Sequence, residues 1–81
     1  MKYRTNLTSE TFPTFEDAAE FVAGRLGFEQ NELAADLQEP DGSIAAHDTL
    51  DAMICSGGLR VLVSVPDNST SEPDAIITCE D

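Results

Sequence analysis

The stretch "TFEDAAEFVAGRLG", residues 14–27, decides the fold because it combines helical apolar spacing with a start signal and a stop signal. Thr14 is a good N-cap, and Asp17 completes a start that resembles a capping box. Gly27 is a suitable C-cap. The apolar stripe consists of Phe15, Ala18, Ala19, Val22 and Leu26, with Phe21 at its edge. We therefore expect a helix over residues 15–26 that buries this stripe.

Three segments outside the helix have the pattern of strands. Residues 2–8 alternate between apolar and polar positions, which predicts a half-buried strand. Residues 59–65, "LRVLVSV", are rich in β-branched side chains and predict a central strand. Residues 74–79, "DAIITC", predict a final strand, and the polar residues 66–73 between these two predict an exposed loop.

Residues 29–47 admit two interpretations. Leu33 and Leu37 have the spacing of one helix face, which favours a short helix. The turn signal "PDGS", residues 40–43, instead favours a hairpin of residues 33–39 with residues 43–47. The turn chemistry favours a strand that ends near Glu39, but the choice stays open because the apolar pattern fits both structures.

The length of the chain indicates one domain over residues 1–81. Residues 48–54 predict a short helical segment capped by Asp48. Together these elements predict an α+β domain, with one main helix packed on a small, mostly antiparallel sheet of three to five strands.

The order of these elements resembles the second half of a ubiquitin-like β-grasp domain. The resemblance covers about residues 12–65 and is carried by the helix after Thr14, the acidic turn in "PDGSIAAHDTL" and the strand "LRVLVSV". It implies a protein–protein adaptor. Two features depart from that family: about a dozen residues precede the helix, too few for its N-terminal hairpin, and the chain ends in "CED" instead of a di-glycine tail. A role as a conjugated modifier is therefore not supported.

Charge is the strongest compositional feature of the chain. Sixteen Asp and Glu face four Lys and Arg, for a formal net charge of -12. Direct binding to nucleic acid and to anionic membranes is disfavoured, because both need Lys and Arg. No apolar run approaches the roughly 20 residues of a membrane span, and residues 1–10 lack the apolar segment of a signal peptide. We expect a cytoplasmic protein.

Residues that could carry catalysis or bind a metal are few. His47 is the single histidine, and with Cys55 and Cys79 it falls short of a four-ligand zinc site. The loop "DNSTSEPD", residues 67–74, lacks the central Gly and closing Glu of a calcium loop. We expect no enzyme activity and no cofactor or metal. Reduced thiols are the expectation for the two cysteines, although the sequence leaves open whether they pair.

The carboxylates themselves are the candidate site. Residues 28–42 hold five of them with no Lys or Arg, and nothing in the local sequence indicates a structural benefit from those after the helix. A basic partner would neutralise them. The candidate partner-binding residues are Glu16, Asp17, Glu20, Glu29, Glu32, Asp36, Glu39 and Asp41.

In composition, the chain resembles the phage-encoded DNA-mimic inhibitors, which include many anti-CRISPR proteins. The resemblance implies a non-enzymatic inhibitor in the host cytoplasm that binds a basic protein or nucleoprotein complex, such as a CRISPR effector. Three alternatives remain open. The first is the adaptor, which would bind through its sheet face. The second is acidity that serves only solubility or adaptation to salt. The third is a thiol protein centred on Cys55 or Cys79.

Overall fold

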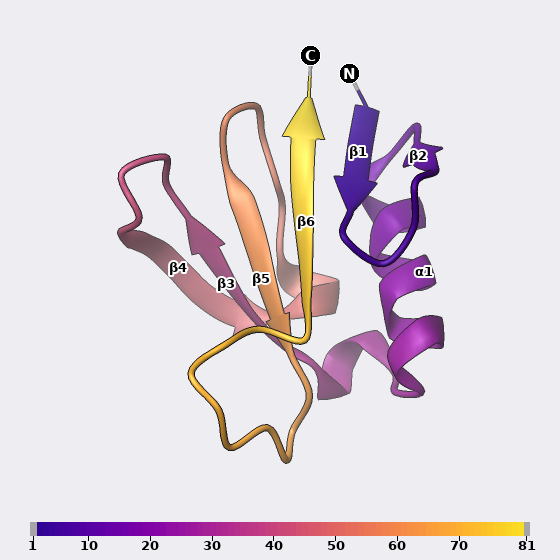
Figure 1. The fold of residues 1–81 in the computed structure, drawn as a ribbon, viewed down its shortest axis with the longest axis vertical. Coiled ribbons are helices and arrows are strands. Elements are labelled where there is room, and N and C mark those ends of the chain that lie inside the picture. Colours follow the sequence, from indigo (N-terminus) through magenta and orange to yellow (C-terminus); the bar gives the residue numbers. More distant parts are fainter. Residues whose placement is uncertain (1, 81) are drawn as a thin grey trace.

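A computed structural model of the protein describes residues 2–80 and shows one α-helix, two short 3-10 helices and a six-stranded sheet (Figure 1). In chain order the elements are β1 (Lys2–Thr5), β2 (Thr11–Phe12), α1 (Phe15–Leu26), η1 (Gln30–Glu32), β3 (Ala34–Gln38), β4 (Ile44–Thr49), η2 (Leu50–Ala52), β5 (Arg60–Ser64) and β6 (Ala75–Glu80). None of the described helices is long and apolar enough to cross a membrane.

The sheet is antiparallel throughout, in the order β2-β1-β6-β5-β3-β4. Helix α1 packs against one face, where it contacts β1, β2 and β6 (Figure 1). The α+β class is thus confirmed, but the sheet has six strands where three to five were predicted.

The strand missed from the sequence is β2. Its two residues pair with β1 in the register Tyr3 with Phe12 and Arg4 with Thr11. The residues before the helix were predicted to be too few for the N-terminal hairpin of a β-grasp domain; the structure shows a shorter hairpin there, of β1 with a two-residue strand, which the prediction did not include. Two residues suffice because β1 offers them a paired edge, and so short a strand has no periodicity of its own to detect.

The open choice over residues 29–47 resolves as a hairpin. In the turn between β3 and β4, Glu39 N–H donates to the Ser43 carbonyl at 2.9 Å, and Gly42 adopts a φ of 94° that favours glycine. Strand β3 ends at Gln38, next to the predicted end at Glu39.

The prediction of a helical segment over residues 48–54 is wrong at both ends. Strand β4 continues to Thr49, with Asp48 opposite Ala35, and Leu50 N–H donates to the Leu33 carbonyl at 3.0 Å. Pairing with β3 takes up the backbone groups that a helix starting at Asp48 would need. Only the 3-10 turn η2 remains helical, over Leu50–Ala52.

Helix α1 matches its prediction in bounds and caps. Thr14 Oγ1 accepts the Asp17 N–H at 3.1 Å, and Gly27, with a φ of 81°, donates its N–H to the Ala23 carbonyl at 2.9 Å. Within the predicted stripe, the two alanines and Val22 are buried, whereas Phe15 and Leu26 are partly buried. Ala23 is also buried, which the stripe did not include.

The core lies between α1 and the sheet. The sheet contributes side chains from alternate positions of adjacent strands, including Val61, Val63 and Ile77, which are 0% exposed. Leu33 and Leu50, which flank η1 and the start of η2, are also 0% exposed. Because alternate side chains of each strand enter this core, the others point away from α1. These outward-pointing side chains form a separate surface of the sheet.

Candidate interaction surfaces

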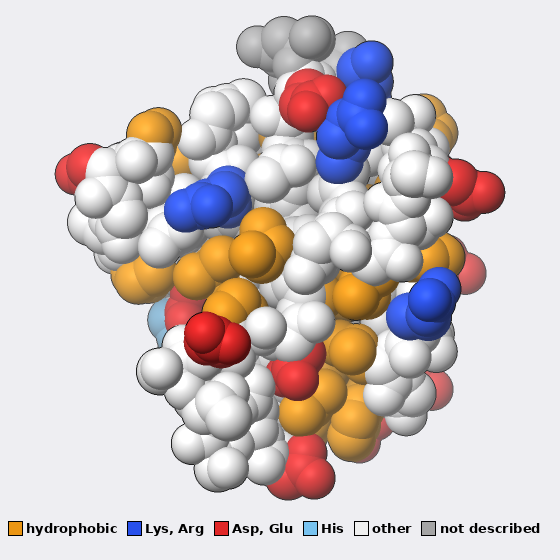
Figure 2. All heavy atoms as spheres, in the orientation of Figure 1, with side chains coloured by type: hydrophobic (Ala, Val, Ile, Leu, Met, Phe, Trp, Pro, Cys, Tyr) orange, Lys and Arg blue, Asp and Glu red, His pale blue; other side chains and the backbone are white. Residues whose placement is uncertain are grey.

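The face of the sheet that points away from α1, called the open face below, collects most of the cations. Three of the four Lys and Arg lie there, because Lys2 and Arg4 alternate with the buried positions of β1 and Arg60 with those of β5. Figure 2 shows this face, with apolar side chains in its middle. Its strand residues are Lys2, Arg4, Thr11, Ala34, Asp36, Gln38, Ile44, His47, Thr49, Arg60, Leu62, Ser64, Ile76, Thr78 and Glu80.

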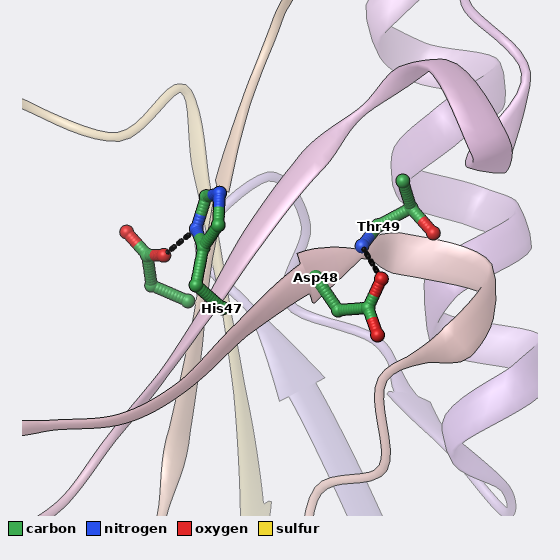
Figure 3. A network of polar contacts seen from close by, with 4 residues as sticks. His47, Asp48 and Thr49 are labelled. Atoms are coloured by element: carbon green, nitrogen blue, oxygen red, sulfur yellow. Dashed lines mark hydrogen bonds and ion pairs between the residues drawn. The ribbon is translucent and has the colours of Figure 1, made fainter.

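Both carboxylates on the strands of the open face have a partner: Glu80 pairs with Arg4, and Asp36 contacts His47. Arg4 Nε–H donates to Glu80 Oε2 at 2.8 Å. His47 Nδ1 contacts Asp36 Oδ1 in the register pair between β4 and β3 (Figure 3). Asp36 was one of the predicted partner-binding residues, but its contact with His47 and its place among the cations separate it from the other acids.

Five of the predicted partner-binding residues lie along α1 and at η1. We call them the acidic surface; they are Glu16, Asp17, Glu20, Glu29 and Glu32. All five are exposed. Arg25, in the last turn of α1, lines the same depression as Asp17 and Glu20, and its guanidinium lies 5.9 Å from the centre of the Phe21 ring. The fold therefore separates the acids of the helix side from the three cations of the open face.

The last two predicted residues, Glu39 and Asp41, lie in the turn between β3 and β4. In Figure 1 this turn and α1 are at opposite edges of the molecule. Asp41 Oδ1 accepts hydrogen bonds from Ser43 Oγ at 2.6 Å and Ser43 N–H at 2.9 Å, which lower the pKa of the Asp41 carboxyl. The acidic stretch 28–42 is consequently not one surface.

Several of the acids after α1 accept local hydrogen bonds that were not expected from the sequence. Glu32 Oε1 accepts the Glu29 N–H at 2.9 Å at the start of η1, and Asp41 holds the hairpin turn through Ser43. The inference that the acids after the helix bring no local benefit is therefore wrong for Glu32 and Asp41, and also for Glu39, whose Oε2 accepts a hydrogen bond from Ser43 Oγ at 3.2 Å. The contacts of Glu32 and Asp41 follow known short-range patterns, the reach of a glutamate back to an N-cap and the turn made by an aspartate.

A groove beside the acidic surface was not anticipated. It is a shallow depression, widely open to solvent, with a volume of about 600 Å³, and it lies between α1 and β2. Its lining residues are Phe12, Asp17, Glu20, Phe21, Gly24 and Arg25. The one signal in the sequence was Gly24, an unexplained glycine inside a helix.

The two cysteines lie in the core as free thiols. Burial raises the pKa of the Cys55 thiol to about 11, so the reactive thiolate is disfavoured at neutral pH. Burial also raises the pKa of Tyr3, beside Cys79. His47 is on the open face, on the other side of the sheet from Cys79, which shares the buried face with its register partner Tyr3.

The loop over residues 66–73 uses its oxygens internally. Asp74 Oδ2 accepts the Val65 N–H at 2.8 Å and the Asn68 Nδ2–H at 2.8 Å, while Asn68 Oδ1 accepts the Thr70 N–H at 2.7 Å. Among residues 2–80, no three His, Cys, Asp or Glu side chains are grouped as metal ligands would be. The surfaces available for chemistry are thus the acidic surface with its groove and the open face.

Comparisons with known protein families, with curated proteins and with solved structures find no match. No residue role is therefore transferred from a relative. Charge, exposure and shape carry the assignment of function.

Proposed function

We propose that the protein is a non-enzymatic acidic inhibitor that binds a basic, nucleic-acid-handling protein and presents carboxylates where phosphates would lie. The observation that carries this proposal is the separation of charge. The fold places Lys2, Arg4 and Arg60 on the open face and leaves the five exposed carboxylates of the acidic surface with Arg25 as their neighbouring cation.

Two carboxylates of the acidic surface repel each other in the isolated protein. Glu16 and Glu20 lie one helical turn apart, about 6 Å along the axis, and like charges at this spacing cost a few tenths of a kcal/mol. Neither side chain forms an ion pair with the described residues. Lys and Arg on a partner remove this repulsion, and their attraction speeds association in a manner that salt weakens.

A groove built for nucleic acid is the partner surface that matches best, because its Lys and Arg are already placed to meet a row of negative charges. A CRISPR effector, with its positively charged channel, is one such partner. In this proposal the protein acts in the cytoplasm of a host cell and does not itself contact nucleic acid.

The test is a pull-down with the tagged protein from nuclease-treated bacterial lysate, washed at low and at high salt and analysed by mass spectrometry. The proposal expects a nucleic-acid-handling complex that high salt or added DNA releases. The double variant Glu16→Gln/Glu20→Gln should lose most of the captured complex. The matched variant Asp67→Asn/Glu72→Gln removes two exposed charges elsewhere and should retain it. Equal capture by both variants, or capture that resists salt, contradicts the proposal.

The open face favours a second candidate function, an adaptor that binds through the sheet. Leu62 and Ile76 are register partners in the middle of this face, and Ile44 at its edge is 50% exposed. Apolar side chains on an accessible face are typical of protein–protein contacts. In this case capture would survive high salt and would be lost in the variant Ile44→Ser/Leu62→Ser.

A further inference from the structure

The groove between α1 and β2 has an aromatic floor. The rings of Phe12 and Phe21 lie with their centres 5.3 Å apart at an interplanar angle of 40°. Both side chains are partly buried against the core, so their positions are fixed by packing. A fixed aromatic pair beside an open volume of about 600 Å³ offers apolar surface to a side chain from outside the protein.

Gly24 keeps this groove open. It lies inside α1, and a Cβ atom built on it would meet nothing within 4 Å, so neither packing nor its backbone conformation requires glycine here. Glycine inside a helix costs about 0.5–1 kcal/mol relative to alanine. The fold thus accepts a less stable residue at a position that lines the groove.

The two ends of the groove differ in charge. Asp17 and Glu20 lie toward the N-terminal end of α1, and Arg25 lies about 12 Å further along the helix axis from Asp17. Neither acid forms an ion pair with the described residues, whereas Arg25 is placed over Phe21. A cation therefore gains most at the end that holds Asp17 and Glu20.

We propose that the groove receives an apolar or aromatic side chain of the basic partner, with an adjacent arginine or lysine paired to Asp17 and Glu20. This inference rests on the proposed function and adds a specific anchor to it. An arginine suits the site because its planar guanidinium pairs with carboxylates in two-point contacts and packs on aromatic rings. The charges on the acidic surface attract the partner, and the groove selects the segment that enters.

The probe for the test is the synthetic peptide acetyl-Lys-Phe-Arg-Lys-amide, compared with acetyl-Lys-Ala-Arg-Lys-amide, which has the same charge and no aromatic ring. Each is titrated into the full chain at low salt and followed by amide NMR spectra. We expect the phenylalanine peptide to shift the amides of Phe12 and residues 17–25 and to bind about tenfold more tightly than the alanine peptide.

The decisive variant is Gly24→Leu, which fills the groove and raises helix propensity, so it should fold at least as well as the original chain. It should weaken binding of the phenylalanine peptide about tenfold and leave the alanine peptide unaffected. The control variant Asn31→Leu adds the same side chain at an exposed position in η1 and should change neither affinity.

The outcomes separate the two proposals. If both peptides bind with equal affinity, lose affinity as salt is raised and bind the Gly24→Leu variant unchanged, the groove inference is wrong. The proposed function of the acidic surface is then retained. If neither peptide binds at low salt, the proposed function fails with it. If the groove amides shift with protein concentration before any peptide is added, a second copy of the chain occupies the groove and the inference is overturned.

Discussion

Substitution by alanine is predicted to have opposite effects on stability at two glycines three positions apart, one inside α1 and one at its C-terminal cap. Gly24 is inside α1, where an added Cβ atom meets nothing within 4 Å. Gly27 ends the helix at a φ of 81° and donates its N–H to the Ala23 carbonyl. Gly24→Ala should therefore stabilise the protein and Gly27→Ala should destabilise it.

The magnitudes follow from the backbone at each site. At Gly24, alanine restricts the unfolded chain and suits the helix, for a gain of about 0.5–1 kcal/mol. At Gly27, alanine must adopt the left-handed region, which costs about 1–2 kcal/mol. In a domain of this size each kcal/mol moves the thermal midpoint by roughly 4–8 °C. The two variants should consequently differ in midpoint by about 10 °C.

Urea unfolding monitored by circular dichroism measures both changes, with equal slopes against urea as the check that the unfolded surface is the same. If Gly24→Ala is destabilising, the backbone of α1 is not open at this position and the account of the groove is incorrect. If Gly27→Ala is neutral, the helix does not end in the left-handed conformation described above.

Two further predictions concern a partly buried aspartate and a buried thiol. Asp74→Ala leaves the Val65 N–H without its acceptor and should reduce the free energy of unfolding by about 1–3 kcal/mol in urea titrations, whereas Asp67→Ala, in the same loop, should be neutral. The Cys55 thiol, with its pKa of about 11 against an ordinary value of 9.0, contributes no pH dependence below about pH 9. Above that pH the unfolded chain releases a proton that the folded protein retains, so stability should fall as the pH rises toward about 11. Cys55→Ala should reduce this slope in unfolding curves, leaving the part due to Tyr3, whose pKa is also raised by burial; an unchanged slope contradicts the assignment.

The bounds of α1 could be predicted because its signals lie within its own sequence. The errors in the predicted fold arose where pairing with another strand decides the structure. The start, stop and buried face of the helix depend on Thr14, Gly27 and the apolar stripe, which all belong to this one segment. The local sequence is therefore sufficient to predict the helix. The strand β2 exists because β1 lies beside it, and Asp48 is in a strand because β3 pairs with it. Interactions between distant segments decided these elements, and local pattern could not supply them.

The same limit applies to the candidate site. The sequence identified the carboxylates, and the capping pattern at Glu29 and the turn at Asp41 were within reach of local rules. It could not show that Arg4 and Arg60, far apart in the chain, share one row of the sheet through their common register partner Thr78. That separation of charge, more than the number of acids, now supports the proposed function.

The distribution of charge also affects how the protein is oriented as it approaches a charged surface. The cations of β1 and β5 on the open face and the acids of α1 and η1 on the helix side contribute an electric dipole, in addition to the net charge of -12. Near a positively charged surface, the dipole produces a torque that turns the helix side inward before contact. Approach with the open face first brings Lys2, Arg4 and Arg60 toward that surface, although Asp36 and Glu80 on the same face offset part of the repulsion. If the protein binds a basic partner as proposed, the sheet register that places three cations on one face also contributes to the orientation of their encounter.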